Sequence, residues 1–270
     1  MSMKCGLCQN ERSLRSSHCI PGALIHLCRD VGFEPIHILD GTAFTTSYEA
    51  RAPFLCFECE AKFDKLGEST VIAQCLRRPG AFPFREKLRG LRPVSCLEGS
   101  RVYMSAQLPS SDVDALKYFA ASVFWRSSAM QWKIAKRRYT KDNLGYKYRE
   151  QFRKYLLGES GYPSKAAMVM IVSDDDDLAP FVLWPSVTRG EGCHRHVFYI
   201  PGIEFNLFVG NVLPEEIRRL RLASGDNLII FLELFRKTEL YQALKSATQS
   251  VQPKGKLRSW LESINSQSNY

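Results

Sequence analysis

The sequence predicts an α+β fold in which a small N-terminal zinc module of two strands and a helix (ββα) precedes a larger domain of helices and a mainly antiparallel sheet. Three observations lead to this prediction. Two C-x-x-C pairs, CGLC at 5–8 and CFEC at 56–59, have the spacing of zinc ligands. Apolar residues recur at helical spacing between 116 and 124. They alternate at strand spacing between 203 and 209.

The chain divides into four regions that differ in amino-acid composition. The zinc module covers 1–75, and a Pro- and Arg-rich connector, which we expect to pack irregularly, covers 76–111. An α+β domain with a basic helical segment covers 112–247, and a polar, loosely ordered tail covers 248–270. With 270 residues, 45% of them hydrophobic, the chain is long enough to bury a core in one or two domains.

The paired cysteines define the zinc module. A C-x-x-C turn brings two thiolates close enough to share a tetrahedral zinc ion, and two such turns complete a closed structural site. A helix-prone stretch, EAKFDKLGES, follows the second pair, so a knuckle, a hairpin and a helix would form a treble clef. The alternative is four buried thiols in an apolar core. The predicted zinc ligands are Cys5, Cys8, Cys56 and Cys59; we interpret most of Cys19, Cys28, Cys75, Cys96 and Cys193 as small buried hydrophobes.

The larger domain begins with a helix that Ser111 or Asp112 can cap. A second helix covers about 143–157 and ends at Gly158. The segment HVFYIPGIEFNLFVG predicts a hairpin that turns at Pro201-Gly202. Further strands are expected in APFVLWPSV and NLIIFLELF, and a short helix is expected in LPEEIRRLRLASG.

Three segments together resemble the zinc-bound branch of the HNH, or ββα-metal, endonucleases: CGLC at 5–8, SHCIP at 17–21 and LCFECE at 55–60. The resemblance covers about residues 5–68, and it is shared with uncharacterised bacterial proteins that carry SH-x-I-P and L-C-x-x-C-E signatures. It implies a metal-dependent DNA endonuclease, in which a histidine activates the water that attacks a phosphodiester. It also implies a role in bacterial anti-phage defence, together with a partner protein.

The resemblance assigns roles to particular residues. His18 matches the general base, and Glu60 matches the helix position that holds a catalytic divalent ion. If the helix after the last cysteine is regular, Asp64 and Glu68 share one face with Glu60. Such a row of carboxylates suits Mg²⁺ or Mn²⁺, which prefer oxygen ligands.

Two features depart from the family pattern. Ser17 stands where the family commonly has a second metal ligand, and no asparagine lies between the histidine and the second cysteine pair. Asp40, Glu49 or a backbone carbonyl could orient the histidine instead. In the alternative interpretation, His18 packs in the hairpin, and Glu60 is a carboxylate favoured by the helix dipole. The protein would then be a non-catalytic zinc finger that binds nucleic acid or scaffolds a defence complex.

The charge of the chain favours an anionic partner. Lys and Arg number 37 against 28 Asp and Glu, for a net charge of +9, which favours nucleic acid over a membrane. Basic residues concentrate between 126 and 154, interleaved with Trp132, Tyr139, Tyr146 and Tyr148, which could stack on bases. The alternative is a solvated helix face whose aromatics point to the core. The predicted nucleic-acid contacts are Lys133, Lys136, Arg137, Arg138, Lys141, Lys147 and Arg149.

Two other motifs are weaker candidates for metal sites. CHRH at 193–196 places His194 and His196 on one strand face, which we interpret as a partly exposed strand edge. SDDDD at 173–177 is interpreted as a solvated acidic loop or a helix start.

Several classes of protein are excluded by missing motifs. The sequence has no P-loop, no dinucleotide-binding glycine pattern and no G-x-S-x-G elbow. The first residues lack the apolar core of a signal peptide, and no apolar run is long enough to span a bilayer. Nine cysteines do not suit a secreted disulfide framework. We therefore expect a soluble protein of the reducing cytoplasm.

Overall fold

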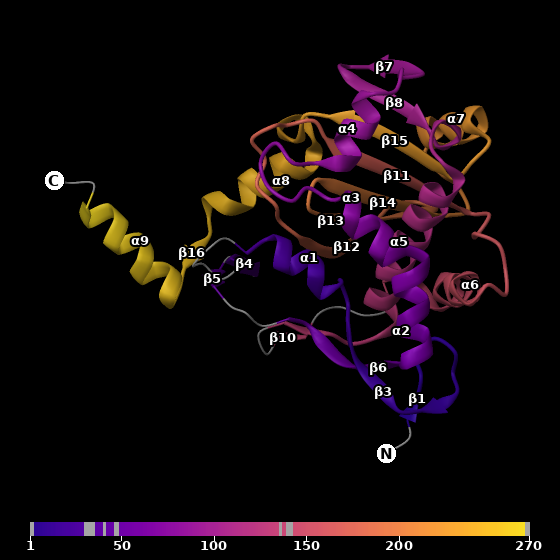
Figure 1. The fold of residues 1–270 in the computed structure, drawn as a ribbon, viewed down its shortest axis with the longest axis horizontal. Helices are drawn as coiled ribbons and strands as arrows, with labels where there is room; N and C mark the ends of the chain where they lie inside the picture. The colour runs from indigo at the N-terminus through magenta and orange to yellow at the C-terminus, as the bar shows by residue number, and fades with distance from the viewer. Residues whose placement is uncertain are drawn as a thin grey trace.

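The computed structural model describes residues 3–29, 36–39, 42–45, 49–134, 137–138 and 143–267, and Figure 1 shows how their elements are arranged. The centre is a seven-stranded sheet of order β12-β13-β14-β11-β15-β8-β7. Every neighbouring pair is antiparallel except β11 and β15, so the predicted mainly antiparallel sheet is confirmed. Its strands are β7 (Ser95–Leu97), β8 (Ser100–Met104), β11 (Ala166–Ser173), β12 (Leu183–Arg189), β13 (Cys193–Ile200), β14 (Ile203–Gly210) and β15 (Leu228–Glu233).

The predicted hairpin forms between β13 and β14, with Pro201 and Gly202 in the turn. Gly202 has a φ of +84°, and a Cβ at this position would lie 2.5 Å from the ring of Phe82, so only glycine fits. The alternating apolar residues of the outgoing strand are buried: Ile203, Phe205, Leu207 and Val209.

One long helix, α5 (Ser110–Ala129), connects the sheet to the N-terminal elements. Its N-cap residue is Pro109, which lies before both predicted caps, and no side chain caps its first turn. On the sheet, Phe124 meets Phe198 with ring centroids 4.8 Å apart. Towards the N-terminal elements, Trp125 stacks on Phe54 at 5.4 Å. Because both sides of α5 are covered, one continuous core runs from the cysteine end of the chain into the sheet.

In the N-terminal region, two longer strands pair, and a helix follows the second of them. β3 (Leu14–His18) pairs antiparallel with β6 (Arg51–Cys56), and α2 (Phe57–Phe63) follows β6 directly with Cys56 as its N-cap residue. The helix continues through a π-helical segment, η1 (Asp64–Glu68), into α3 (Ser69–Gln74). The pair β1 (Met3–Lys4) and β2 (Glu11–Arg12) flanks the first C-x-x-C turn, and α1 (Gly22–Leu27) follows β3.

Ser17 has a structural role within this hairpin. The register of β3 and β6 shifts between Arg15 and Ser16, which leaves a backbone N–H of β6 without a ladder partner. The Oγ of Ser17 accepts this hydrogen from Leu55 at 3.0 Å, and the Ser17 side chain is buried. A serine at this position therefore satisfies the backbone at the irregularity.

The predicted connector is more regular than expected. Residues 76–111 contain α4 (Pro83–Arg89) and the sheet strands β7 and β8, so the prediction of irregular packing is wrong. The reason is charge pairing: Arg89 and Arg101 from this segment form ion pairs with Asp174. Asp175 pairs with Arg236, so the acidic loop after β11 is held by arginines and is not simply solvated.

The prediction of a loosely ordered tail is also wrong for 252–267. β16 (Gln252–Pro253) pairs parallel with β5 (Thr42–Thr45) beside β4 (Ile36–Leu39), and α9 (Lys256–Gln267) extends away from the body in Figure 1. The apolar Leu257 of α9 is buried, which compensates for the polar composition of the tail. No described helix has the length and apolar character needed to cross a membrane. The remaining elements are η2 (Ser105–Gln107), β9 (Lys133–Ile134), β10 (Arg137–Arg138), α6 (Gly145–Leu157), α7 (Glu215–Ser224), η3 (Phe235–Lys237) and α8 (Glu239–Gln249).

Candidate metal centre and active site

Four cysteine side chains meet where the first turn reaches the start of α2. The sulfur atoms of Cys5, Cys8, Cys56 and Cys59 all lie within 4.8 Å of one another, a set that could hold a metal ion. Sγ of Cys8 lies 3.9 Å from Sγ of Cys56, which joins the two pairs across the module. Within the described part of the chain, no other three cysteine, histidine or carboxylate ligands come this close together. The structure is therefore consistent with a structural metal site at the predicted cysteines.

Burial opposes the ionisation of the thiols in this cluster. Burial raises the pKa of the Cys56 thiol to about 11, and burial and the neighbouring sulfurs raise the pKa of Cys59 further. At Cys5, burial acts in the same direction, but hydrogen bonds, first from the backbone of Cys56, hold the pKa below its ordinary value. Adjacent thiolates repel one another, so a metal ion is what allows all four thiols to lose their protons.

Contacts from two other elements fix the turn of the first cysteine pair. Gly6 donates its backbone N–H to the carbonyl of Phe54 at 2.9 Å. A Cβ at Gly6 would lie 2.1 Å from the Phe54 ring, so this close approach requires glycine. Arg153 on α6 donates to the carbonyl of Leu7 at 2.9 Å. The turn is thus attached both to β6 and to α6.

A carboxylate orients the predicted general base. Nε2 of His18, at the end of β3, lies 2.9 Å from Oε2 of Glu49, two residues before β6. Glu49 is one of the orienting groups considered from the sequence, whereas Asp40 lies outside the described residues. The side chains of His18 and Glu49 are 26% and 12% exposed, so the pair is partly shielded but still reached by solvent.

The same carboxylate binds two further side chains from the end of α1. Nε2 of His26 lies 3.0 Å from Oε1 of Glu49, and Nη2 of Arg29 lies 3.2 Å from that oxygen. Burial acts to raise the pKa of Glu49, but hydrogen bonds from His18 and His26 outweigh it and lower the pKa below its ordinary value. Glu49 is therefore a carboxylate near neutral pH, and it joins two imidazoles and a guanidinium.

The predicted row of carboxylates does not form a metal-ligand set. Glu60, Asp64 and Glu68 are all described, yet their oxygens do not meet within the distance found for the cysteines. The helix is not regular here, because the π-helical segment covers Asp64–Glu68. Asp64 accepts a hydrogen bond from Ser69, while Oε1 of Glu60 is buried without a partner. A divalent ion held by all three carboxylates does not fit this arrangement.

A buried arginine neutralises the last member of the row. Arg126 on α5 is 1% exposed, and its Nη2 lies 2.7 Å from Oε1 of Glu68. Its Nη1 donates to the backbone carbonyl of His18 at 3.1 Å, and its guanidinium lies over the ring of Phe63. Burial raises the pKa of Glu68, and Arg126 opposes that effect. Arg126 therefore links β3 to the π-helical segment through an internal cation.

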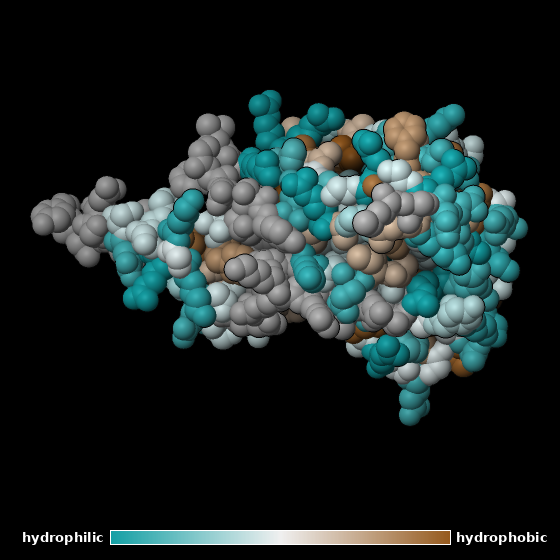
Figure 2. All heavy atoms as spheres, turned by 90° about the horizontal axis from the view of Figure 1, so that it is seen from below, coloured by the Kyte–Doolittle hydropathy of each residue, from teal (hydrophilic) through white to brown (hydrophobic). Residues whose placement is uncertain are grey.

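The predicted nucleic-acid contacts are only partly placed. Lys133 on β9 and Lys147 on α6 are exposed, and Arg149 on α6 lies over the ring of Tyr146, which is 75% exposed. Lys136 and Lys141 lie outside the described residues, as do the side chains of Arg137 and Arg138. The face of the molecule drawn in Figure 2 is largely hydrophilic, with small apolar patches.

Some aromatic side chains of the basic segment pack in the hydrophobic core. Trp132 is fully buried and donates its Nε1–H to the carbonyl of Arg126, so it is not available to stack on a base. Tyr148 packs against the core, and Tyr139 lies outside the described residues. The interpretation of these aromatics as base-stacking side chains is wrong for Trp132, because this residue, between α5 and β9 in the chain, is buried in the core.

The histidine pair on β13 is not at an exposed edge. His196 is buried beside Phe124, and β12 covers this side of β13 as the edge strand. Burial, His194 and Arg189 lower the pKa of His196 to about 4, so its ring is neutral near pH 7. No third ligand lies near enough for a metal site among the described residues.

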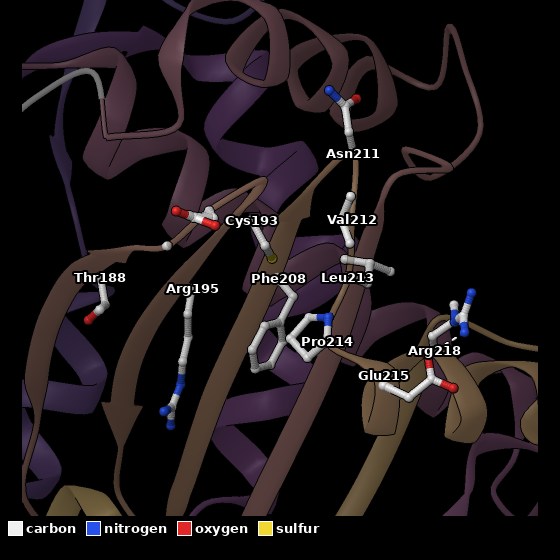
Figure 3. A pocket seen from close by; sticks show the side chains of 12 residues that line it. Thr188, Cys193, Arg195, Phe208, Asn211, Val212, Leu213, Pro214, Glu215 and Arg218 are labelled. Atoms are coloured by element: carbon white, nitrogen blue, oxygen red, sulfur yellow. Dashed lines mark hydrogen bonds and ion pairs between the residues drawn. The ribbon is translucent and has the colours of Figure 1, made fainter.

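An open pocket of about 780 Å³ lies on another part of the molecule, between the ends of β12, β13 and β14 and the start of α7 (Figure 3). Phe208 and Pro214 line it together with Arg195 and Arg218. The two guanidiniums already form ion pairs, with Glu239 and with Glu215. None of the pocket residues belongs to the N-terminal strands or helices, so the pocket is separate from the histidine site.

Three important residues were not singled out from the sequence: His26, Arg29 and Arg126. His26 follows His18 by eight residues, within a short helix that begins after Pro21. This recurrence of histidine was the available signal. Arg126 was counted as part of the basic segment, because nothing in the sequence shows that a helix is buried on both sides.

Comparison of the chain with models of protein families, with curated proteins and with solved structures finds no match in any of the three.

Proposed function

We propose that this protein is a phosphodiester hydrolase of the HNH type that acts on nucleic acid, with DNA as the expected substrate. The observation that carries the proposal is the hydrogen bond between His18 and Glu49. It lies at the end of the two-stranded sheet of β3 and β6, and this sheet and the following helix supply two of the four clustered cysteines, Cys56 and Cys59. A knuckle, a hairpin and a helix joined in this way form a treble clef, and the resemblance to HNH nucleases concerns this same segment.

The geometry gives His18 a defined chemical role. When Glu49 accepts the hydrogen of Nε2, the neutral imidazole presents the lone pair of Nδ1. No described residue makes a further hydrogen bond to this ring. Nδ1 can therefore take a proton from a water as that water attacks phosphorus. Glu49 stabilises the imidazolium that forms, as an asparagine carbonyl oxygen would do less strongly.

The metal ions expected from the resemblance differ in how well the residues suit them. Four clustered thiols are the ligands of a structural zinc ion, which would fix the hairpin and the helix relative to each other. Because the three carboxylates do not come together, we assign no step to Mg²⁺ or Mn²⁺. A role in anti-phage defence and a partner protein stay predictions of the resemblance.

Cleavage assays test the proposal. Supercoiled plasmid and single-stranded DNA are incubated with and without Mg²⁺ or Mn²⁺, using the wild type and the His18→Ala, Glu49→Gln and Glu60→Ala variants. Loss of the base lowers the rate by about 10²–10⁴-fold, and loss of the Glu49 charge lowers it in the same direction. The matched control is His194→Ala, on β13, which leaves cleavage unchanged. Bound zinc and thermal unfolding are measured for each variant to confirm that it is folded. Equal cleavage by wild type and His18→Ala would disprove the role of His18.

A second candidate is a non-catalytic zinc module that binds nucleic acid. The ion pair of Arg126 with Glu68 favours it, because an internal cation already neutralises one of the carboxylates expected to bind a metal. In that case the wild type does not cleave but binds DNA, and binding weakens as salt rises. Replacing both Lys147 and Arg149 on α6 by Ala would then reduce the slope of the logarithm of the binding constant against the logarithm of salt concentration by about 2, one for each lost phosphate contact.

A further inference from the structure

The side chain of His26 is the least explained part of the candidate site. It comes from α1, whereas His18 comes from β3, yet both Nε2 atoms lie within 3.0 Å of the same carboxylate. The two rings bind different oxygens of Glu49, which places them on either side of one charged group. The His26 side chain is 57% exposed, so a bound polymer can reach its ring.

This arrangement supplies two proton-transfer groups instead of one. Hydrolysis of a phosphodiester needs a base for the attacking water and an acid for the leaving oxygen, since an alkoxide is a poor leaving group. Glu49 fixes both rings through Nε2, so the Nδ1 atoms of both are turned away from the carboxylate. Among the described residues, neither ring makes another side-chain hydrogen bond.

A cation and the backbone of a helix complete the site. Arg29 binds the same oxygen of Glu49 as His26, and its side chain is 37% exposed. Its guanidinium can also donate to a phosphate oxygen while it contacts the carboxylate. Gly22, at the start of α1, lies against the pair: a Cβ there would be 3.4 Å from both Glu49 Oε2 and His18 Nε2. The backbone of α1 therefore packs closely against His18 and Glu49.

We propose that His26 is the general acid of the reaction, and that Arg29 binds the phosphate on which the two histidines act. This assignment rests on the hydrolase function proposed above. His18 takes a proton from water, and the oxygen of that water forms a bond to phosphorus. The bond from phosphorus to the leaving oxygen breaks, and the leaving oxygen receives the Nδ1 proton of the protonated His26. The products are a phosphate monoester and an alcohol, and the two histidines have exchanged protonation states.

The assignment explains why one carboxylate serves both rings. Glu49 contacts the two rings through different oxygens, so the ring that gains a proton and the ring that gives one are held by the same group. The guanidinium of Arg29 offsets the remaining charge of Glu49 when both rings are neutral.

The test compares two substrates that differ in the leaving group. One is a deoxydinucleotide, whose leaving alkoxide needs a proton. The other is a nucleotide p-nitrophenyl phosphodiester, whose nitrophenolate leaves without one. We expect His26→Gln to lower kcat/KM for the dinucleotide by about 10²–10⁴-fold but to change it less than about tenfold for the nitrophenyl ester. His18→Gln is expected to lower both rates, because water must be activated for either substrate. Arg29→Met is expected to raise KM for both substrates.

Failure of the proposed role of His26 can be distinguished from failure of the hydrolase function. His194→Gln, a histidine of β13, is the matched control and should leave both rates unchanged. Bound metal and unfolding temperature show that each variant is folded. If the wild type cleaves both substrates and His26→Gln loses equal activity on each, or none, the acid role of His26 is wrong while the hydrolase stands. If the wild type cleaves neither substrate, the hydrolase function itself is wrong, and the role of His26 with it.

Discussion

Buried histidines give this protein a dependence on pH that is separate from any catalysis. His196 lies on β13 beside Phe124, and its Nε2 is buried without a hydrogen-bond partner. Burial and nearby positive charge lower its pKa from 6.5 to about 4. As the pH falls below 6.5, the unfolded chain therefore takes up a proton at this residue before the folded protein does.

We predict that His196→Phe removes part of the acid sensitivity of folding. The contribution of His196 to stability is complete above pH 6.5 and is lost as the pH falls towards 4, amounting to about 3 kcal/mol. Phe has a similar shape, adds no buried polar atom and does not titrate. The measurement is urea unfolding of wild type and variant at several pH values between 7 and 4. A difference in stability between the two proteins that stays constant with pH would contradict this assignment.

The spacing of the cysteines was enough to predict the cysteine cluster. The sequence carried much less information about the partner of His18 and about the burial of His196. Two C-x-x-C pairs allow few arrangements, so the cluster was predictable from spacing alone. Glu49 was only one of several candidates to orient His18, because its distance of 31 positions is bridged by the pairing of β3 with β6. The burial of His196 depended on which strand lies at the sheet edge, and the sequence does not give that order.

At the scale of elements, the helix that follows the second cysteine pair differs from the regular α-helix that the sequence analysis assumed. The sequence correctly predicts a helix at this place, but periodicity does not reveal a π-helical segment within it. The segment brings Gly67 against α5, where a Cβ would lie 2.9 Å from the backbone nitrogen of Phe119. The π-helical segment therefore lies at the packing contact between two helices.

Gly67→Ala should destabilise the protein, because the added methyl group meets backbone atoms that cannot move independently. We expect a loss of about 1–3 kcal/mol in the free energy of unfolding. Gly161→Ala is the matched control, since a Cβ there meets nothing within 4 Å and we expect a change within about 0.5 kcal/mol. Chemical denaturation measures both. Equal stability of the two variants would show that η1 can move away from α5 at no cost.

At the scale of the whole molecule, the main hydrophobic core of the described residues joins regions that the sequence suggested were separate. Apolar residues near the cysteines and apolar residues of the sheet belong to one cluster, with α5 between them. The predicted boundaries at residues 75 and 111 followed the cysteine spacing and the arginine content of the sequence. Neither property shows which side chains of different regions pack against each other. Mixed α+β character and the direction of most strands were predictable because alternation and turn residues are local signals.

Removal of the metal should consequently affect the entire protein. We expect chelation, or Cys8→Ser, to lower the midpoint of a single thermal transition by about 5–10 °C, which corresponds to about 2–4 kcal/mol of lost cross-link stabilisation. The unfolding of wild type with and without chelator is followed by circular dichroism and by tryptophan fluorescence, since Trp125 lies in the shared core. Two separate transitions, one of them insensitive to chelator, would show instead that the sheet folds without the module.

The cysteine cluster also has a consequence for how this chain can vary in length. Cys8 and Cys56 are 48 positions apart, and both His18 and Glu49 lie between them. Closing a longer loop costs little additional entropy, about 0.6 kcal/mol for each doubling of its length. Insertions or deletions between α1 and β6 would therefore be tolerated, provided that the two ends still reach the metal and the carboxylate. The length of this segment can therefore change while the cysteine cluster and the contact of His18 with Glu49 are kept.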